Sequence, residues 1–189
     1  MTVKGKIRII GGRYRGRKIP IVNEGIRPTS DRVRETLFNW LSSKLVDKSC
    51  LDLFAGTGIL GIEASSRGAR RVVFVDHQQS IVLEIQNQIS TLKLKNCSVV
   101  PSDALRFLDN PKYLGSFDVI FLDPPFGAYN LKKLLDHIEQ TQSLKPEGMV
   151  YYESKQPLEK SIIYESWDNY RESKAGNVYY GLLTKKILN

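Results

Sequence analysis

The chain has 189 residues, 41% of them hydrophobic and 25% charged, a composition that indicates a globular domain with its own core. It contains no apolar run of the roughly 18 residues that a membrane span needs, and its first residues lack the apolar segment of a signal peptide, so we expect a cytoplasmic protein without a membrane anchor. Cys50 and Cys97 form no metal-binding spacing with each other or with a histidine, so we expect buried, reduced thiols and no metal site.

The formal net charge of +8 is concentrated at one end of the chain. Residues 1–34 contain ten Lys or Arg and two acids, whereas basic and acidic residues balance over the remainder. These basic residues alternate with Ile, Tyr and Gly, as in an ordered hairpin. The segment therefore predicts a contact with nucleic acid rather than a merely solvated run of charge.

The first predicted elements are two strands, over 6–10 and 13–22, joined by a tight turn at Gly11-Gly12. Pro28 marks a boundary, after which Thr29, Ser30 or Asp31 caps a helix. The apolar face of that helix is formed by Val33, Leu37, Trp40 and Leu41. We expect a basic hairpin extension over 1–28 and one main domain over 29–189.

The main domain alternates strands and helices. Strands are predicted at 50–56, 71–76, 97–103, 117–125 and 147–154, and helices at 59–68, 78–94, 104–109 and 129–144, the first of these ending at Gly68. An antiparallel hairpin over 165–186 ends the pattern. Repeated βα units predict an α/β fold with a mostly parallel sheet and helices on both faces.

Four predicted strands end in an acid: Asp52, Asp76, Asp103 and Asp123. Ligands of open α/β sheets bind beyond the carboxyl ends of the strands, so these residues mark the expected site. Gly56-Thr57-Gly58 opens a G-x-G-x-x-G match that ends at Gly61, and Asp76 follows Gly56 by 20 residues, as in dinucleotide-binding proteins. Alone the match is weak, because tight strand-to-helix turns need glycine anyway.

Two features argue against a nicotinamide cofactor. Asp52 precedes the glycines inside the strand, where it would repel a pyrophosphate but suit a ligand with an amino group. Hydride transfer also has no evident use for the tetrapeptide Asp123-Pro124-Pro125-Phe126. A cofactor with an adenosine, an amino group and a sulfonium fits better. Its predicted contacts are Asp52, Phe54, Ala55, Gly56, Thr57 and Gly58 around the turn, Asp76 at the ribose, and His77, Asp103 and Ala104 at the adenine.

These motifs resemble those of S-adenosylmethionine-dependent methyltransferases, and the D-P-P-F tetrapeptide is typical of enzymes that act on amines. The segments 8–19, 27–41, 52–69, 117–126 and 175–183 follow the order seen in the RsmD family of 16S rRNA (guanine-N2)-methyltransferases, over nearly the whole chain. Thr57 stands where the family often has Ser, and Asp76 where it often has Glu. The resemblance implies a Rossmann-like class I fold with a seven-stranded sheet.

The resemblance also implies a reaction. S-adenosylmethionine would methylate N2 of a guanine and leave as S-adenosylhomocysteine. Asp123 and the Pro124 carbonyl would accept hydrogen bonds from the amine, Pro125 would help to fix the backbone, and Phe126 would stack on the base. The implied substrate is 16S rRNA within the small ribosomal subunit or a late precursor, bound by a monomer. The expected RNA contacts are Arg8, Arg13, Tyr14, Arg15, Arg17, Lys18, Arg27, Arg32 and Arg34.

Three other functions stay open at this stage. An adenine-N6 methyltransferase for DNA or RNA would share the tetrapeptide, although such enzymes more often have Asn at the position of Asp123. A nicotinamide dehydrogenase would bind NAD and not S-adenosylmethionine. A non-catalytic RNA-binding protein could also retain the fold, but the intact set of acids and glycines argues against it.

Overall fold

The computed structural model describes residues 5–21, 29–125, 127–158 and 166–186. Its central sheet consists of β3 (Ser49–Asp52), β4 (Arg71–Asp76), β5 (Cys97–Pro101), β6 (Phe117–Leu122), β7 (Leu144–Ser154), β8 (Trp167–Ala175) and β9 (Val178–Lys185). The spatial order is β5-β4-β3-β6-β7-β9-β8. The first five strands are parallel, and β9 runs antiparallel to both β7 and β8. The predicted mostly parallel, seven-stranded α/β sheet is thus confirmed, and so is the C-terminal hairpin.

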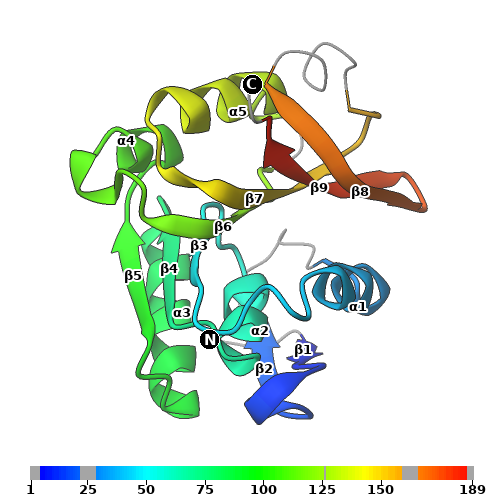
Figure 1. The fold of residues 1–189 in the computed structure, drawn as a ribbon. Helices are drawn as coiled ribbons and strands as arrows, with labels where there is room; N and C mark the ends of the chain where they lie inside the picture. The colour runs from blue at the N-terminus through cyan, green and yellow to red at the C-terminus, as the bar shows by residue number, and fades with distance from the viewer. Residues whose placement is uncertain (1–4, 22–28, 126, 159–165, 187–189) are drawn as a thin grey trace.

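Helices cover both faces of this sheet (Figure 1). The first face carries α1 (Asp31–Trp40), α2 (Ile59–Ser66) and α3 (Gln79–Leu92), and the second carries α4 (Ala104–Leu108) and α5 (Leu131–Gln140). The central strand β6 contributes to both cores, because successive side chains of a strand point to opposite faces. Val119 and Phe121 pack with the first set of helices, and Ile120 and Leu122 with the second. Among the described residues, no helix is long and apolar enough to cross a membrane.

The first helix begins where the sequence predicts. The Ser30 hydroxyl accepts a hydrogen bond from the Val33 N–H at 3.4 Å and so caps α1. Val33, Leu37 and Leu41 are buried, while Trp40 is half-buried and stacks on Tyr180 with ring centroids 5.6 Å apart. The predicted apolar face therefore attaches α1 to the core. Beyond the predicted elements, a short 3-10 helix covers Pro111–Tyr113.

The N-terminal strands form a separate two-stranded antiparallel sheet, but its turn differs from the prediction. The strands are β1 (Gly5–Arg8) and β2 (Lys18–Ile21), and a longer loop with a 3-10 helix at Gly12–Tyr14 joins them. Gly12 has a φ of +72°, and a Cβ there would lie 1.9 Å from the Ser66 carbonyl oxygen. The glycines thus permit close approach to the end of α2, and the predicted tight turn at Gly11-Gly12 is wrong.

This hairpin shares the core of the main domain. Ile7, Ile9 and Ile19 are buried and pack with the helices of the first face. The Tyr14 N–H also donates to the Ser66 hydroxyl at 2.9 Å, which attaches the loop to α2. The predicted boundary at 28 lies outside the described residues, so the division into 1–28 and 29–189 stays a prediction.

Candidate active site

The acids that end the strands gather at one edge of the sheet. Asp52 is the last residue of β3, and its register partners are Phe74 on β4 and Phe121 on β6. Asp76 and Asp123 follow those partners by two residues, so they lie at the same edge. The Asp76 charge raises the pKa of Asp52, and the Asp52 charge raises the pKa of Asp123. The topology therefore brings together acids that are far apart in the sequence.

The turn after β3 is built by glycines and by Asp52. Gly58, with a φ of +73°, precedes α2, and Gly61 packs so closely on β4 that a Cβ would lie 2.3 Å from the Phe74 ring. The Asp52 Oδ2 atom accepts the Gly61 N–H at 2.9 Å. Only 2% of Asp52 is exposed, and this burial raises its pKa to about 7; the Gly61 N–H opposes the rise and the Asp76 charge adds to it. A ligand cation here would favour the ionised carboxylate.

Asp76 is held in place by backbone N–H groups. Its Oδ2 accepts the Gly56 N–H at 3.1 Å and its Oδ1 accepts the Gln78 N–H at 2.9 Å. Each oxygen keeps a further lone pair, so the carboxylate can still accept hydrogen bonds from the two hydroxyls of a ribose. The His77 ring lies beside it, with Nδ1 3.8 Å from Asp76 Oδ1, and is 61% exposed.

Asp103 accepts three hydrogen bonds that the sequence did not assign to it. Its Oδ1 caps α4 by accepting the Leu105 and Arg106 N–H groups, and its Oδ2 accepts the Tyr129 hydroxyl at 3.1 Å. Burial raises the pKa of Asp103, but the hydrogen bonds outweigh it, so that the pKa lies below its ordinary value. The Tyr129 ring also packs on Phe54, with centroids 4.9 Å apart. Tyr129 thus links the glycine turn to Asp103. It lies three residues after the D-P-P-F tetrapeptide, but nothing in its local sequence indicates Asp103 as its partner.

Asp123 lies next to a second carboxyl group. Leu122 pairs with Tyr152 in the β6–β7 register, so the next residues, Asp123 and Glu153, are neighbours on adjacent strands. Burial raises the pKa of Asp123 well above its ordinary value, and the charges of Glu153 and Asp52 raise it further. The Thr29 hydroxyl opposes this by donating to Asp123 Oδ2 at 3.4 Å.

Glu153 was missed by the sequence analysis, although its place at a strand end was a usable signal. It is 7% exposed and accepts the Tyr151 hydroxyl at 2.8 Å. With Pro124 and Pro125 it lines a cavity of about 350 Å³. The predicted Phe126 lies outside the described residues.

The predicted RNA-contacting residues differ in how far their side chains are exposed to solvent. Most are exposed to solvent: Arg8, Arg13, Arg15, Arg17, Lys18 and Arg32, with Tyr14 half-buried. Arg34 is an exception, because its side chain is fully buried and paired with Glu63 at 2.8 Å. The assignment of Arg34 to RNA is therefore wrong, and Arg27 lies outside the described residues.

Comparison with known proteins identifies the family. Residues 7–184 match a family described as conserved hypothetical protein 95. The ribosomal RNA small subunit methyltransferases D of Haemophilus influenzae and Escherichia coli K12 are each 40% identical to the chain; the alignments cover 96% of it and 95% and 91% of those proteins. The chain belongs to the RsmD family.

Membership of the RsmD family agrees with the fold. The structure of the putative methyltransferase yhhF from Escherichia coli matches with a TM-score of 0.85 at 40% identity, covering 97% of this chain and 100% of that one. The family resemblance predicted from the motifs is thus confirmed, together with the Rossmann-like methyltransferase fold. The roles of the individual residues at the strand ends stay predictions.

Proposed function

We propose that the protein transfers a methyl group from S-adenosylmethionine to N2 of a guanine in 16S rRNA, within the small ribosomal subunit or a late precursor, and that it acts as a monomer. Methyl transfer to ribosomal RNA is the activity named for its RsmD relatives. The choice of guanine N2 is supported by one observation in this chain: Asp123 and Glu153 are neighbours on adjacent strands, and Glu153 lines the cavity together with Pro124 and Pro125.

The residues at the strand ends fit the cofactor. Asp52 would accept hydrogen bonds from the amino group of the cofactor, and Asp76 from the ribose of the cofactor. The loop of Gly56 and Gly58 leaves room for the cofactor to approach the backbone closely. S-adenosylmethionine supplies an electrophilic methyl group on a sulfonium, which leaves as the neutral thioether S-adenosylhomocysteine. The chain's own contribution is to bind both partners in line, which can supply about 7–11 kcal/mol of the barrier.

Two carboxyl groups match the edge of guanine. This edge presents N–H donors at both N1 and N2, whereas adenine presents an amine beside the N1 acceptor. Asp123 accepts an N–H of the reacting amine and so directs electron density toward its nitrogen. Glu153 accepts the N1–H of the same base. An adenine would leave one buried carboxylate facing a lone pair, which disfavours it.

After transfer, the nitrogen must lose a proton. Asp123 is the nearest acceptor in this assignment, and its raised pKa makes its carboxylate a stronger base than an ordinary one. The Pro124 carbonyl accepts the second N–H of the amine. Since neither proline has a free backbone N–H, none competes for the base edge.

The deciding experiment is transfer of labelled methyl from S-adenosylmethionine to unmethylated small ribosomal subunits, with naked 16S rRNA and duplex DNA in parallel. The labelled nucleoside is identified by mass spectrometry. We expect N2-methylguanosine on the subunit. Label in N6-methyladenosine would overturn the choice of base and keep the reaction. Absence of transfer to every substrate, with cofactor still bound, would refute the catalytic assignment.

A further inference from the structure

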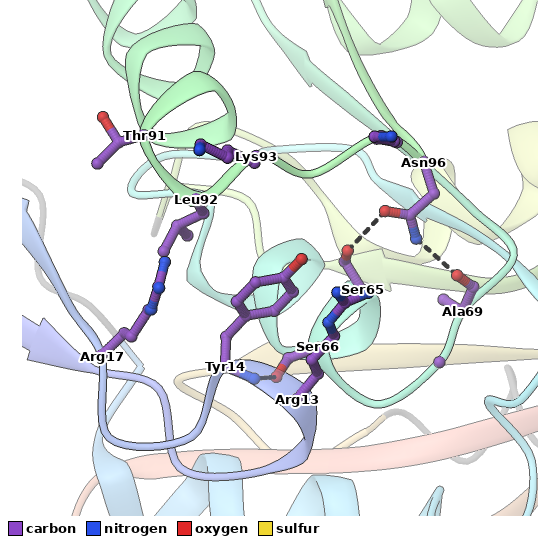
Figure 2. A pocket seen from close by; sticks show the side chains of 12 residues that line it. Arg13, Tyr14, Arg17, Ser65, Ser66, Ala69, Thr91, Leu92, Lys93 and Asn96 are labelled. Atoms are coloured by element: carbon purple, nitrogen blue, oxygen red, sulfur yellow. Dashed lines mark hydrogen bonds between the residues drawn. The ribbon is translucent and has the colours of Figure 1, made fainter.

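A second concave site lies at the opposite edge of the sheet, where the strands begin. It has a volume of about 800 Å³ and lies between the loop of the N-terminal hairpin and the end of α3 (Figure 2). Arg13, Tyr14 and Arg17 line it from the loop, and Lys93 and Lys95 from the segment after α3. We call this site the basic groove. None of the catalytic or cofactor residues proposed above belongs to it.

The charge of the basic groove is strongly positive. Arg13, Arg17, Lys93 and Lys95 are all exposed, and no acid is among the described residues that line the groove. Helices α2 and α3 end beside it, and each helix end contributes only about half a negative charge. The four positive side chains therefore outweigh the negative ends of the two helices by about three charges, so the groove attracts anions.

The shape of the groove is fixed by hydrogen bonds beneath its surface. The Ser65 hydroxyl donates to the Asn96 side-chain oxygen at 2.9 Å, and the Asn96 amide donates to the Ala69 carbonyl at 2.6 Å (Figure 2). On the other side, Tyr14 is held to Ser66 through its N–H. A ligand thus meets a floor whose polar groups are already paired, so that little ordering is needed on binding.

Tyr14 adds an aromatic surface between the cations. The guanidinium carbons of Arg13 and Arg17 each lie 5.7 Å from the centre of its ring. An aromatic ring surrounded by exposed cations is the combination that binds a nucleic-acid strand, through phosphates and through stacking. A site for a small anion alone would need no such ring.

We infer that the basic groove binds the sugar-phosphate backbone of the substrate RNA, as a second contact remote from the methylated base. This inference rests on the function proposed above. It extends the RNA contact to Lys93 and Lys95, which lie more than 70 residues after Arg17 in the sequence.

The distance between the two sites sets how far an RNA must extend in order to contact both. Ala69, in the groove, precedes β4, and Asp76, in the candidate active site, ends it. At about 3.3 Å per residue, β4 separates the two by roughly 20 Å. An RNA must therefore reach from one edge of the sheet to the other to engage both. Folded RNA, or a single strand of more than about six nucleotides at about 3.4 Å each, does this, whereas a short RNA of about three nucleotides around the target base does not.

The test removes the two lysines without disturbing the backbone. Lys93 has a φ of +56°, which Asn tolerates well, so the variant is Lys93→Asn with Lys95→Gln. Lys112→Gln with Lys133→Gln, two exposed lysines on the other face of the sheet, is the charge-matched control. Binding to small subunits is measured as a function of salt, and methyl transfer is measured on subunits and on a short RNA that carries the target guanine.

We expect the groove variant to bind subunits about tenfold more weakly, with a salt slope smaller by about 1.4 for two lost phosphate contacts. Its transfer to the short RNA and its cofactor affinity should equal those of the wild type and the control. An unchanged salt slope on subunits that the wild type methylates would overturn the inference and leave the proposed function intact. If the groove substitutions weakened the binding of 5′-GMP but left the affinity for small subunits unchanged, the groove would be a site for a free nucleotide, and the inference would again be overturned.

Discussion

Arg34 on α1 and Glu63 on α2 form an ion pair of 2.8 Å in which neither side chain is exposed to solvent. The same two residues hold the N-terminal hairpin. The Arg34 guanidinium donates to the Arg8 carbonyl at 3.1 Å, and Glu63 accepts the Ile10 N–H at 2.6 Å. One buried pair thus joins two helices and the basic hairpin, so it determines where the exposed arginines of the hairpin lie.

Replacing Arg34 should therefore affect stability. Arg34→Ala leaves Glu63 without its main partner in the core, and we expect a loss of about 3–5 kcal/mol in the free energy of unfolding, measured by urea denaturation. Arg32→Ala, on the exposed face of the same helix, should change it by at most about 0.5 kcal/mol. Equal effects of the two variants would contradict the structural role of the pair.

Asp123→Asn should separate chemistry from binding. The amide keeps the size of the side chain but no longer accepts a proton, so we expect the turnover number to fall by about 10²–10⁴-fold. Cofactor affinity, measured by calorimetry, should stay within about twofold. The control is Asp118→Asn at the other end of the same strand, which removes the charge of a carboxylate paired with Lys145 at 2.7 Å. Near-normal turnover in Asp123→Asn would refute the assigned role.

Cofactor binding should depend on pH through Asp52. Its pKa of about 7 keeps much of the carboxyl protonated below neutral pH, while the amino group of the cofactor favours the ionised form. The dissociation constant should therefore rise as the pH falls below 7, by up to about tenfold per pH unit, and level off above it. Asp52→Asn should bind more weakly and show a flatter profile. The same steep profile in both proteins would exclude Asp52 as its source.

Glu153→Gln tests the second carboxyl group at the base. Loss of a charged hydrogen bond to guanine should lower kcat/KM by about tenfold or more, mostly through KM. The substitution also removes a charge that raises the pKa of Asp123, so Asp123 should ionise at a lower pH. The acid limb of the kcat profile should then shift to lower pH.

Glu147→Gln, an exposed position on the same strand, is the matched control for that measurement and should leave both quantities unchanged. A Glu153→Gln enzyme with an unaltered KM and an unaltered pH profile would show that Glu153 neither contacts the base nor influences Asp123.

Most of the fold and the position of most candidate-site residues could be predicted from the sequence alone. Alternating strand and helix patterns predicted the parallel sheet, and Asp52, Asp76, Asp103 and Asp123 could be placed together because parallel strands end at one edge. Local chemistry predicted a helix cap at Thr29, Ser30 or Asp31, and Ser30 provides it. These features depend on periodicity and on residues close in the chain, which is the information that a single sequence carries.

Which charged side chains are exposed depends on contacts between distant segments of the chain. Arg34 has the same charge as its exposed neighbours, and its burial depends on Glu63, a partner 29 residues away. Likewise, Glu153 meets Asp123 only through the β6–β7 register, and Lys93 meets Arg17 only because the hairpin docks on α2. Charge is a local property of a residue, but burial and partnership arise from contacts between distant segments. For that reason the sequence could list the basic residues and could not divide them between core and surface.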